Sequence, residues 1–139
     1  MITDEKMQMI ADDTYIYSDL TYKIIGAAYD VHKELGSVHK EIVYHRALAI
    51  EFGNRNIPFV EEKPIDVKFK ENKIGTYRPD FIVDDKVVVE IKAVPAIAKA
   101  MYDKVYYYAK GSKYKLVLLI NFGSPKVTIK RLIYTKDAG

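Results

Sequence analysis

The sequence predicts an α/β domain in which a mixed central β-sheet is flanked by helices. Three observations support this fold class. Apolar residues recur at helical spacing near the N-terminus and again later in the chain. Alternating or β-branched apolar runs, typical of strands, occupy the middle and the end. A length of 139 residues, without repeats or a linker rich in Gly, Ser or Pro, is that of one domain.

Two helices are expected first. The first begins at Ser18, a candidate N-cap, and ends before Gly36. Its apolar positions are Leu20, Ile24, Ala28, Val31 and Leu35. The second runs from His39 or Lys40 to Phe52, before Gly53-Asn54. Its apolar residues on or near one side are Val43, Ala47 and Ile50.

Three strands should follow. Residues 65–69 alternate apolar and charged side chains, as in a half-buried strand. Residues 74–83 form a second strand, in which Gly75 and Pro79 suggest a bulge or irregularity. Val87–Lys92 is an apolar, β-branched run typical of a central, covered strand.

The remaining elements complete the order α-α-β-β-β-α-β-β. A helix is predicted from Pro95 to Lys110, where Gly111 ends it. Two final strands are expected at residues 116–120 and 127–134. We therefore expect an N-terminal extension at residues 1–17 and a single domain at 18–139.

Composition excludes several classes of protein. The chain has no cysteine, which rules out disulfides, thiolate zinc sites and cysteine nucleophiles. The start is acidic rather than basic, unlike a secretory leader, and no apolar run is long enough to cross a membrane. These features predict a cytoplasmic protein with no membrane partner.

The net charge of +3 conceals an uneven distribution along the chain. Residues 1–90 carry 12 basic and 17 acidic side chains, whereas residues 91–136 carry ten basic side chains and one acidic. A basic half is a candidate surface for nucleic acid, DNA or RNA. A solvated, lysine-rich surface is the alternative. The candidates for nucleic-acid contact are Lys99, Lys104, Tyr107 and Lys110.

The residues with chemical potential lie around the third strand. Glu90 and Lys92 share one face of it, because side chains alternate along a strand. If Asp84-Asp85-Lys86 forms the loop, Val83 pairs with Val87 and Asp80 lies opposite Glu90. A two-residue loop would break this site. A charge pair facing solvent is the ordinary alternative, but charges in so apolar a strand are costly to bury.

Two carboxylates without a neighbouring thiolate or imidazole suit a hard divalent cation, Mg²⁺ or Mn²⁺. A metal there could activate water for attack on a phosphodiester, while Lys92 stabilises the developing charge or helps to deprotonate the water. These residues therefore indicate metal-assisted phosphodiester hydrolysis.

These residues resemble the signature of the PD-(D/E)xK nuclease superfamily, whose core order α-β-β-β-α-β is contained in the order above. Further blocks are similar to the GxxExxY family within it, and the resemblance covers about residues 18–134. The blocks are Ile24–Ala28, Val31–Gly36, Glu41–Tyr44 with Ala47-Leu48, and Leu118–Gly123.

The resemblance implies a role for each matching residue. Asp80 and Glu90 would be metal ligands, with the Ile91 carbonyl as a further ligand, Glu41 completing or supporting the site and Lys92 catalytic. Tyr44 would pack or orient Glu41. Val38 stands where the family has glycine, and Lys104 where it often has glutamine. The first departure could alter how the helix presents Glu41.

The tyrosines and histidines have simpler interpretations. Three consecutive tyrosines, 106–108, cannot all face the core of one helix, so at least one should be exposed. His32 is interpreted as packing on a helix flank, and His39 and His45 as surface residues.

The leading hypothesis for the function is a metal-dependent nuclease. The alternative is a non-catalytic module of the same fold that binds nucleic acid or protein, and a homodimer is compatible with either.

Overall fold

The computed structural model describes residues 16–134, so the expected extension at 1–17 lies almost entirely outside the described residues. The helices are α2 (Ser18–Leu35), α3 (Glu41–Asn54) and α4 (Lys99–Lys110). The strands are β1 (Phe59–Glu61), β2 (Ile65–Phe69), β3 (Asn72–Tyr77), β4 (Phe81–Val83), β5 (Val87–Lys92), β6 (Leu116–Asn121) and β7 (Thr128–Ile133). This confirms the predicted α/β class.

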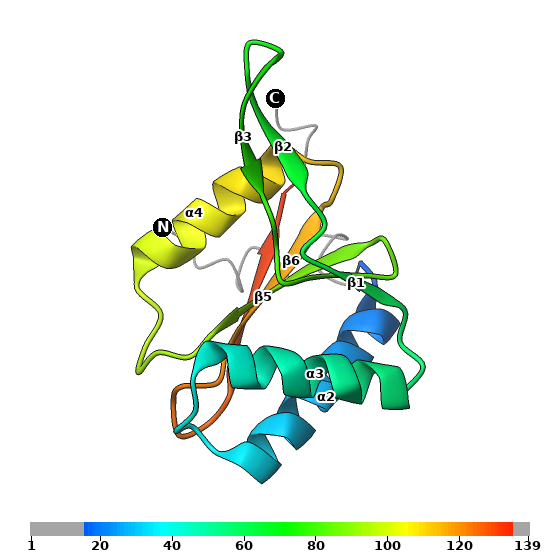
Figure 1. The fold of residues 1–139 in the computed structure, drawn as a ribbon, viewed down its shortest axis with the longest axis vertical. Helices are drawn as coiled ribbons and strands as arrows, with labels where there is room; N and C mark the ends of the chain where they lie inside the picture. The colour runs from blue at the N-terminus through cyan, green and yellow to red at the C-terminus, as the bar shows by residue number, and fades with distance from the viewer. Residues whose placement is uncertain (1–15, 135–139) are drawn as a thin grey trace.

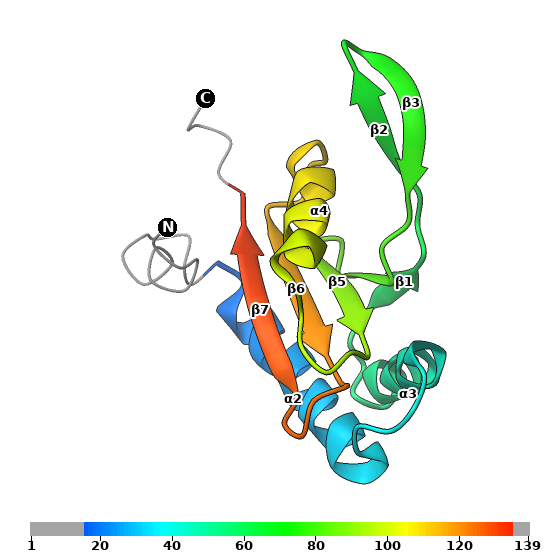
Figure 2. The same ribbon diagram turned by 90° about the vertical axis from the view of Figure 1, so that its left-hand side faces the viewer.

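A five-stranded mixed sheet forms the centre of the molecule (Figure 1). Its strand order is β1-β4-β5-β6-β7. Only β5 and β6 are parallel, and α4 makes the crossover between them, as parallel neighbours require. Strands β2 and β3 form a separate two-stranded hairpin that stands away from this sheet (Figures 1 and 2).

The sheet separates two layers of buried side chains. Val87, Val89 and Ile91 of β5 pack in the layer shared with α2 and α3. Val88 packs instead in the layer shared with α4. Because side chains alternate, Glu90 and Lys92 follow Val88 onto the α4 side. The period of the strand thus positions the charged pair at the end of the central strand.

The predicted strand at residues 74–83 was wrong as a single element. The chain breaks at Arg78-Pro79-Asp80 into β3 and β4, which belong to different sheets. Proline has no backbone N–H with which to continue a ladder, and this one is buried. The expected irregularity near Gly75 does occur, as a register shift between Val67 and Lys68.

Two helix details also differ from expectation. In α3 the buried residues are Tyr44, His45, Leu48 and Phe52, whereas Ile50 is 66% exposed. The third helix begins at Lys99 rather than Pro95. The Asn121 side chain bonds both the N–H and the C=O of Val94, which holds the chain at the end of the sheet before it reaches the helix.

Within residues 16–134, no helix has both the length and the apolar character needed to cross a bilayer.

Candidate functional site

The hairpin between β4 and β5 has the register that the sequence predicts. Val83 pairs with Val87 and Phe81 with Val89. A three-residue loop closes the hairpin, and two of its residues, Asp84 and Asp85, adopt left-handed backbone angles. Asp80 therefore lies opposite Glu90, as expected.

Hydrogen bonds fix both carboxylates across this pair of strands. The backbone N–H of Asp80 donates to Glu90 Oε1 at 3.0 Å, and that of Ile91 donates to Asp80 Oδ2 at 2.8 Å. The Tyr77 hydroxyl donates to Glu90 Oε2 at 2.5 Å. Each strand thus orients the acid of the other, and Tyr77 is a site residue that the sequence analysis missed.

His45 is not a surface residue, so that prediction was wrong. It is 5% exposed and stacks on Phe81, with ring centroids 4.4 Å apart. Its Nδ1 lies 3.0 Å from Asp80 Oδ1, and its Nε2 lies 2.8 Å from Glu61 Oε1. Both bonds can be donated at once only by the protonated ring.

The sequence did contain a signal for His45. It lies four residues after Glu41, so the two share one face of α3. Its second partner, Glu61, could not have been found from periodicity, because β1 is three residues long and mostly exposed.

Glu41 and Lys92 belong to the same electrostatic neighbourhood. Glu41 is the first residue of α3, where the helix N-terminus favours an anion. Burial raises the pKa of Glu41, Asp80 raises it further, and Lys92 opposes the shift. Lys92 ends β5, and its carbonyl accepts a 2.8 Å bond from the Phe122 N–H. The fold therefore brings all four predicted catalytic residues into one region.

Tyr44 is a packing residue of the core, and its contacts are with Phe122 and with the turn before α3. It is fully buried and stacks on Phe122, with ring centroids 4.7 Å apart. Its hydroxyl donates to the Gly36 carbonyl at 2.5 Å and accepts from the His39 N–H at 3.2 Å. Tyr44 thus fixes the turn that leads into α3. Val38, in place of the expected glycine, is 84% exposed in that turn.

Glu41, Glu61, Asp80 and Glu90, here called the carboxylate cluster, carry an excess of negative charge. Burial raises the pKa of Glu90 to about 7, and the nearby Asp80 carboxylate acts in the same direction. Burial alone would lower the pKa of His45, but its hydrogen bonds to Glu61 and Asp80 raise it overall. These shifts are those expected when carboxylates crowd together and an imidazolium lies beside them.

Stability is therefore expected to fall as pH rises from 6 to 8. The contribution of His45 is full below its usual pKa of 6.5 and is lost as pH rises through the raised value. The cost of ionising Glu90 is present above pH 7 and disappears as pH falls towards 4.5. Chemical denaturation of wild type and Glu90→Gln from pH 5 to 8 tests this. As pH rises from 5 to 8, the free energy of unfolding of Glu90→Gln should increase by roughly 2 kcal/mol relative to that of wild type. Parallel pH profiles for the two proteins would contradict this expectation.

The donor types suit a hard divalent cation. Asp80, Glu90 and Glu41 offer carboxylate oxygens, and an oxygen that accepts one hydrogen bond keeps a lone pair for another partner. A cation would also offset the repulsion that raises the pKa values of Glu41 and Glu90. Within residues 16–134, however, no three acidic, histidine or cysteine side chains are already gathered as a metal-binding group.

The predicted nucleic-acid contacts all lie on α4 and are solvent-exposed. Lys99 forms an ion pair with Asp103 at 2.6 Å, and Lys110 lies over the ring of Tyr107 at 5.5 Å. Tyr107 is 65% exposed, which confirms that at least one of the three consecutive tyrosines faces solvent. Lys104 lies 5.9 Å from the ring centre of Tyr108, which stacks on Tyr77. Tyr108 therefore links α4, by way of Tyr77, to Glu90 of the carboxylate cluster.

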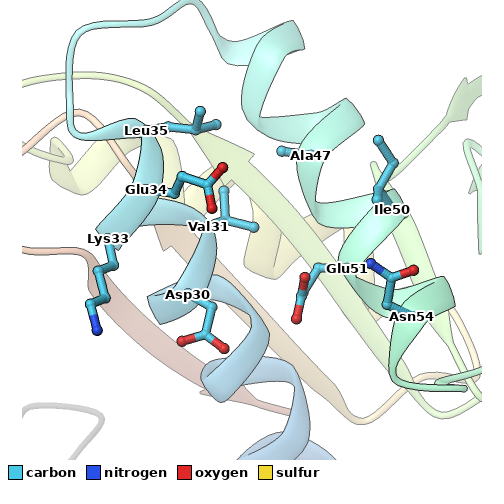
Figure 3. Close-up of a pocket in the computed structure, with 9 residues that line it drawn as sticks. All are labelled: Asp30, Val31, Lys33, Glu34, Leu35, Ala47, Ile50, Glu51 and Asn54. Carbon is cyan, nitrogen blue, oxygen red and sulfur yellow. The ribbon is translucent and has the colours of Figure 1, made fainter.

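A hollow of about 740 Å³ lies elsewhere, between α2 and α3 (Figure 3). Three of the side chains that line it are acidic, namely Asp30, Glu34 and Glu51. None of the predicted catalytic residues lines it.

Comparison with known proteins identifies a family for this chain. A family model described as "PD-(D/E)XK nuclease superfamily" matches residues 18–132. Searches of curated proteins and of solved structures give no match. The matched segment contains every residue of the carboxylate cluster.

Proposed function

Because the chain belongs to the PD-(D/E)XK nuclease superfamily, we propose that it hydrolyses phosphodiester bonds of DNA or RNA with the help of Mg²⁺ or Mn²⁺. Membership supports a nuclease-type function, and such nucleases typically use divalent metals. Asp80 lies opposite Glu90, and hydrogen bonds across the β4–β5 hairpin fix both carboxylates. Lys92 follows Glu90 by two residues on the same strand. This arrangement is the observation that supports the proposal for this chain.

Asp80 and Glu90 would hold the cation, with Glu41 and the Ile91 carbonyl as further donors. A divalent cation bound there would polarise a phosphoryl oxygen and lower the pKa of a coordinated water. The protein contributes the rigidity of the two carboxylates. Their fixed orientation is valuable because small displacements of reacting groups are costly in rate.

Lys92 would stabilise the negative charge that develops on the phosphoryl group, or help to remove a proton from water. It is suited to this role because it shares the face of β5 with Glu90 and ends a strand that pairs with β6 along its whole length. His45 would keep Asp80 oriented through the bond at Oδ1, as outer partners of metal ligands commonly do.

Removal of metal should abolish cleavage. We expect strand cleavage of DNA or RNA in Mg²⁺ or Mn²⁺, no cleavage in EDTA, and recovery when the metal is restored. Metal should also raise the melting temperature. At a concentration of about 100 times Kd, binding to the folded state alone contributes about 2.7 kcal/mol.

The melting shift should be larger at pH 8 than at pH 6, because the raised pKa values of Glu41 and Glu90 leave more of each protonated at the lower pH. Sodium chloride at matched ionic strength controls for the general effect of salt. Undiminished cleavage in EDTA would contradict the proposal.

One observation favours the alternative, a non-catalytic module of the same fold. Both oxygens of Asp80 and both of Glu90 already accept hydrogen bonds within the protein. Such a module would bind nucleic acid or protein without cleaving any substrate. Binding of nucleic acid that persists without cleavage in either metal would select this reading.

A further inference from the structure

The β2–β3 hairpin, residues 65–77, projects from the domain as an arm (Figures 1 and 2). It forms a sheet of its own, in which Ile65 pairs with Tyr77 at the base and Phe69 with Asn72 near the tip. A two-stranded hairpin by itself is at best marginally stable in water. Contacts with a bound partner would stabilise such an arm.

The outer half of the arm exposes apolar side chains. Phe69 is 59% exposed and Ile74 is 67% exposed. They lie on opposite strands near the turn. Residues of this size at a projecting tip offer contact area to a partner, and their exposure has no role in the core of the domain.

The same region carries an excess of positive charge. Residues 65–77 contain three basic side chains, Lys68, Lys70 and Lys73, and two acidic ones, Asp66 and Glu71, so the net charge of the arm is +1. Lys68 pairs directly with Lys73 across the two strands, an arrangement that is destabilising for like charges. Lys73 has Asp66 at 3.5 Å, but both are exposed and such pairs contribute little. Lys70 lies over the ring of Phe69 at 5.3 Å. An anionic ligand would relieve the repulsion at the tip.

The base of the arm is part of the candidate site. Tyr77 donates to Glu90, and Asp80 follows three residues later. Tyr77 also stacks on Tyr108 of α4, with ring centroids 4.5 Å apart. At about 3.3 Å per residue, strands of five and six residues extend roughly 17 to 20 Å from that point. A ligand that contacts both the tip and the candidate site is therefore extended, and an anionic ligand matches the lysines near the tip.

The shape of the arm selects among polyanions. A two-stranded β-ribbon fits the major groove of B-form DNA, which is about 12 Å wide. The major groove of A-form RNA is deep and too narrow to be read in this way. Apolar side chains at the tip are also suited to contact with thymine methyl groups on the groove floor.

We propose that the β2–β3 arm inserts into the major groove of double-stranded DNA, with Lys68 and Lys70 contacting backbone phosphates and Phe69 contacting the groove floor. The arm thereby holds the duplex while the carboxylate cluster at its base faces a phosphodiester. The choice of nucleic acid as ligand rests on the proposed function. The binding itself requires no cleavage.

Binding assays in EDTA test the arm separately from catalysis. Fluorescence anisotropy with a duplex of about 30 base pairs compares wild type with Lys68→Ala/Lys70→Ala between 50 and 200 mM salt. Each lost phosphate contact should lower the slope of log affinity against log salt by about 0.9, so the double variant should lose nearly 2. Its affinity at low salt should fall at least about tenfold.

Two comparisons sharpen the result. Lys23→Ala/Lys33→Ala removes the same charge from exposed positions of α2 and should leave the slope unchanged. Phe69→Ala should weaken binding without changing the slope, because it removes an uncharged contact. Circular dichroism and melting curves verify that the variants fold, which is expected because all five side chains are exposed.

Several outcomes would contradict the proposal that the arm binds duplex DNA. They are an unchanged slope in Lys68→Ala/Lys70→Ala, an equal loss in the α2 control, or an equal loss of affinity for single strands and for duplex RNA. Absence of any DNA binding by wild type would overturn it as well. The predicted loss seen with duplex DNA alone, in a protein that cuts nothing in Mg²⁺ or Mn²⁺, would support the arm and overturn only the nuclease proposal.

Discussion

Asp80→Asn should lower the rate of nucleic-acid cleavage by more than about a hundredfold while leaving the fold intact. Asparagine has the same shape, and its amide oxygen can still accept the Ile91 N–H bond. The substitution removes the negative charge and replaces one of the two carboxylate oxygens, a candidate ligand of the cation, with an amide nitrogen. A metal supplies several kcal/mol of charge stabilisation, and each 1.36 kcal/mol is tenfold in rate.

The chain offers a matched control for this variant. Asp84 lies in the turn between β4 and β5, and its side chain pairs with Lys86 at 3.1 Å. Its backbone is left-handed, with φ of 52°, which asparagine tolerates well. Asp84→Asn should therefore cleave at the wild-type rate.

The measurement is single-turnover cleavage in saturating Mg²⁺, together with duplex binding in EDTA. Lys92→Met should also lose roughly 10² to 10³-fold in rate, because it removes the charge that faces the developing phosphoryl anion. Wild-type cleavage by both Asp80→Asn and Lys92→Met would eliminate the proposed site.

Gly123→Ala should be strongly destabilising, because there is no room for a Cβ at this position. A Cβ at this position would lie 2.3 Å from the backbone nitrogen of Val94 and 2.5 Å from its carbonyl oxygen. Both atoms are held in place by the side chain of Asn121, which is 1% exposed. Backbone atoms cannot move aside as a flexible side chain can. We expect a loss of at least about 3 kcal/mol.

A loss of this size corresponds to a melting temperature lower by about 10 °C. Cleavage should also decline below that melting temperature, because Val94 follows Lys92 by two residues and would be displaced with its loop. Thermal denaturation and activity at 20 °C measure the two effects separately.

Gly53→Ala is the control for the same chemical change. Gly53 lies within α3, and a Cβ there would have no neighbour within 4 Å. Alanine is favoured over glycine in a helix by up to about 1 kcal/mol. Gly53→Ala should thus be neutral or slightly stabilising. A similar melting temperature for Gly123→Ala and Gly53→Ala would contradict the clash.

The sequence alone was sufficient to predict the features that depend on the spacing of residues close together in the chain. Alternation along β5 placed Glu90 and Lys92 on one face, and a three-residue loop set Asp80 opposite Glu90. Helical spacing likewise located α2 and its end before Gly36, although the N-cap is Tyr17 rather than the predicted Ser18. These features follow from geometry within a few residues, and they contain the acidic pair and the lysine of the candidate site.

The tertiary structure decided what depends on distant segments. Periodicity could not show that α3 turns His45 towards Asp80, that the three-residue β1 brings Glu61 to the same imidazole, or that β3 leaves the sheet so that Tyr77 reaches Glu90. Each of these contacts joins side chains 13 to 35 residues apart. Their hydrogen bonds form only after packing has chosen the faces and the strand order. By itself, then, the sequence determined which acids and which lysine share a strand pair, and tertiary packing decided what surrounds and orients them.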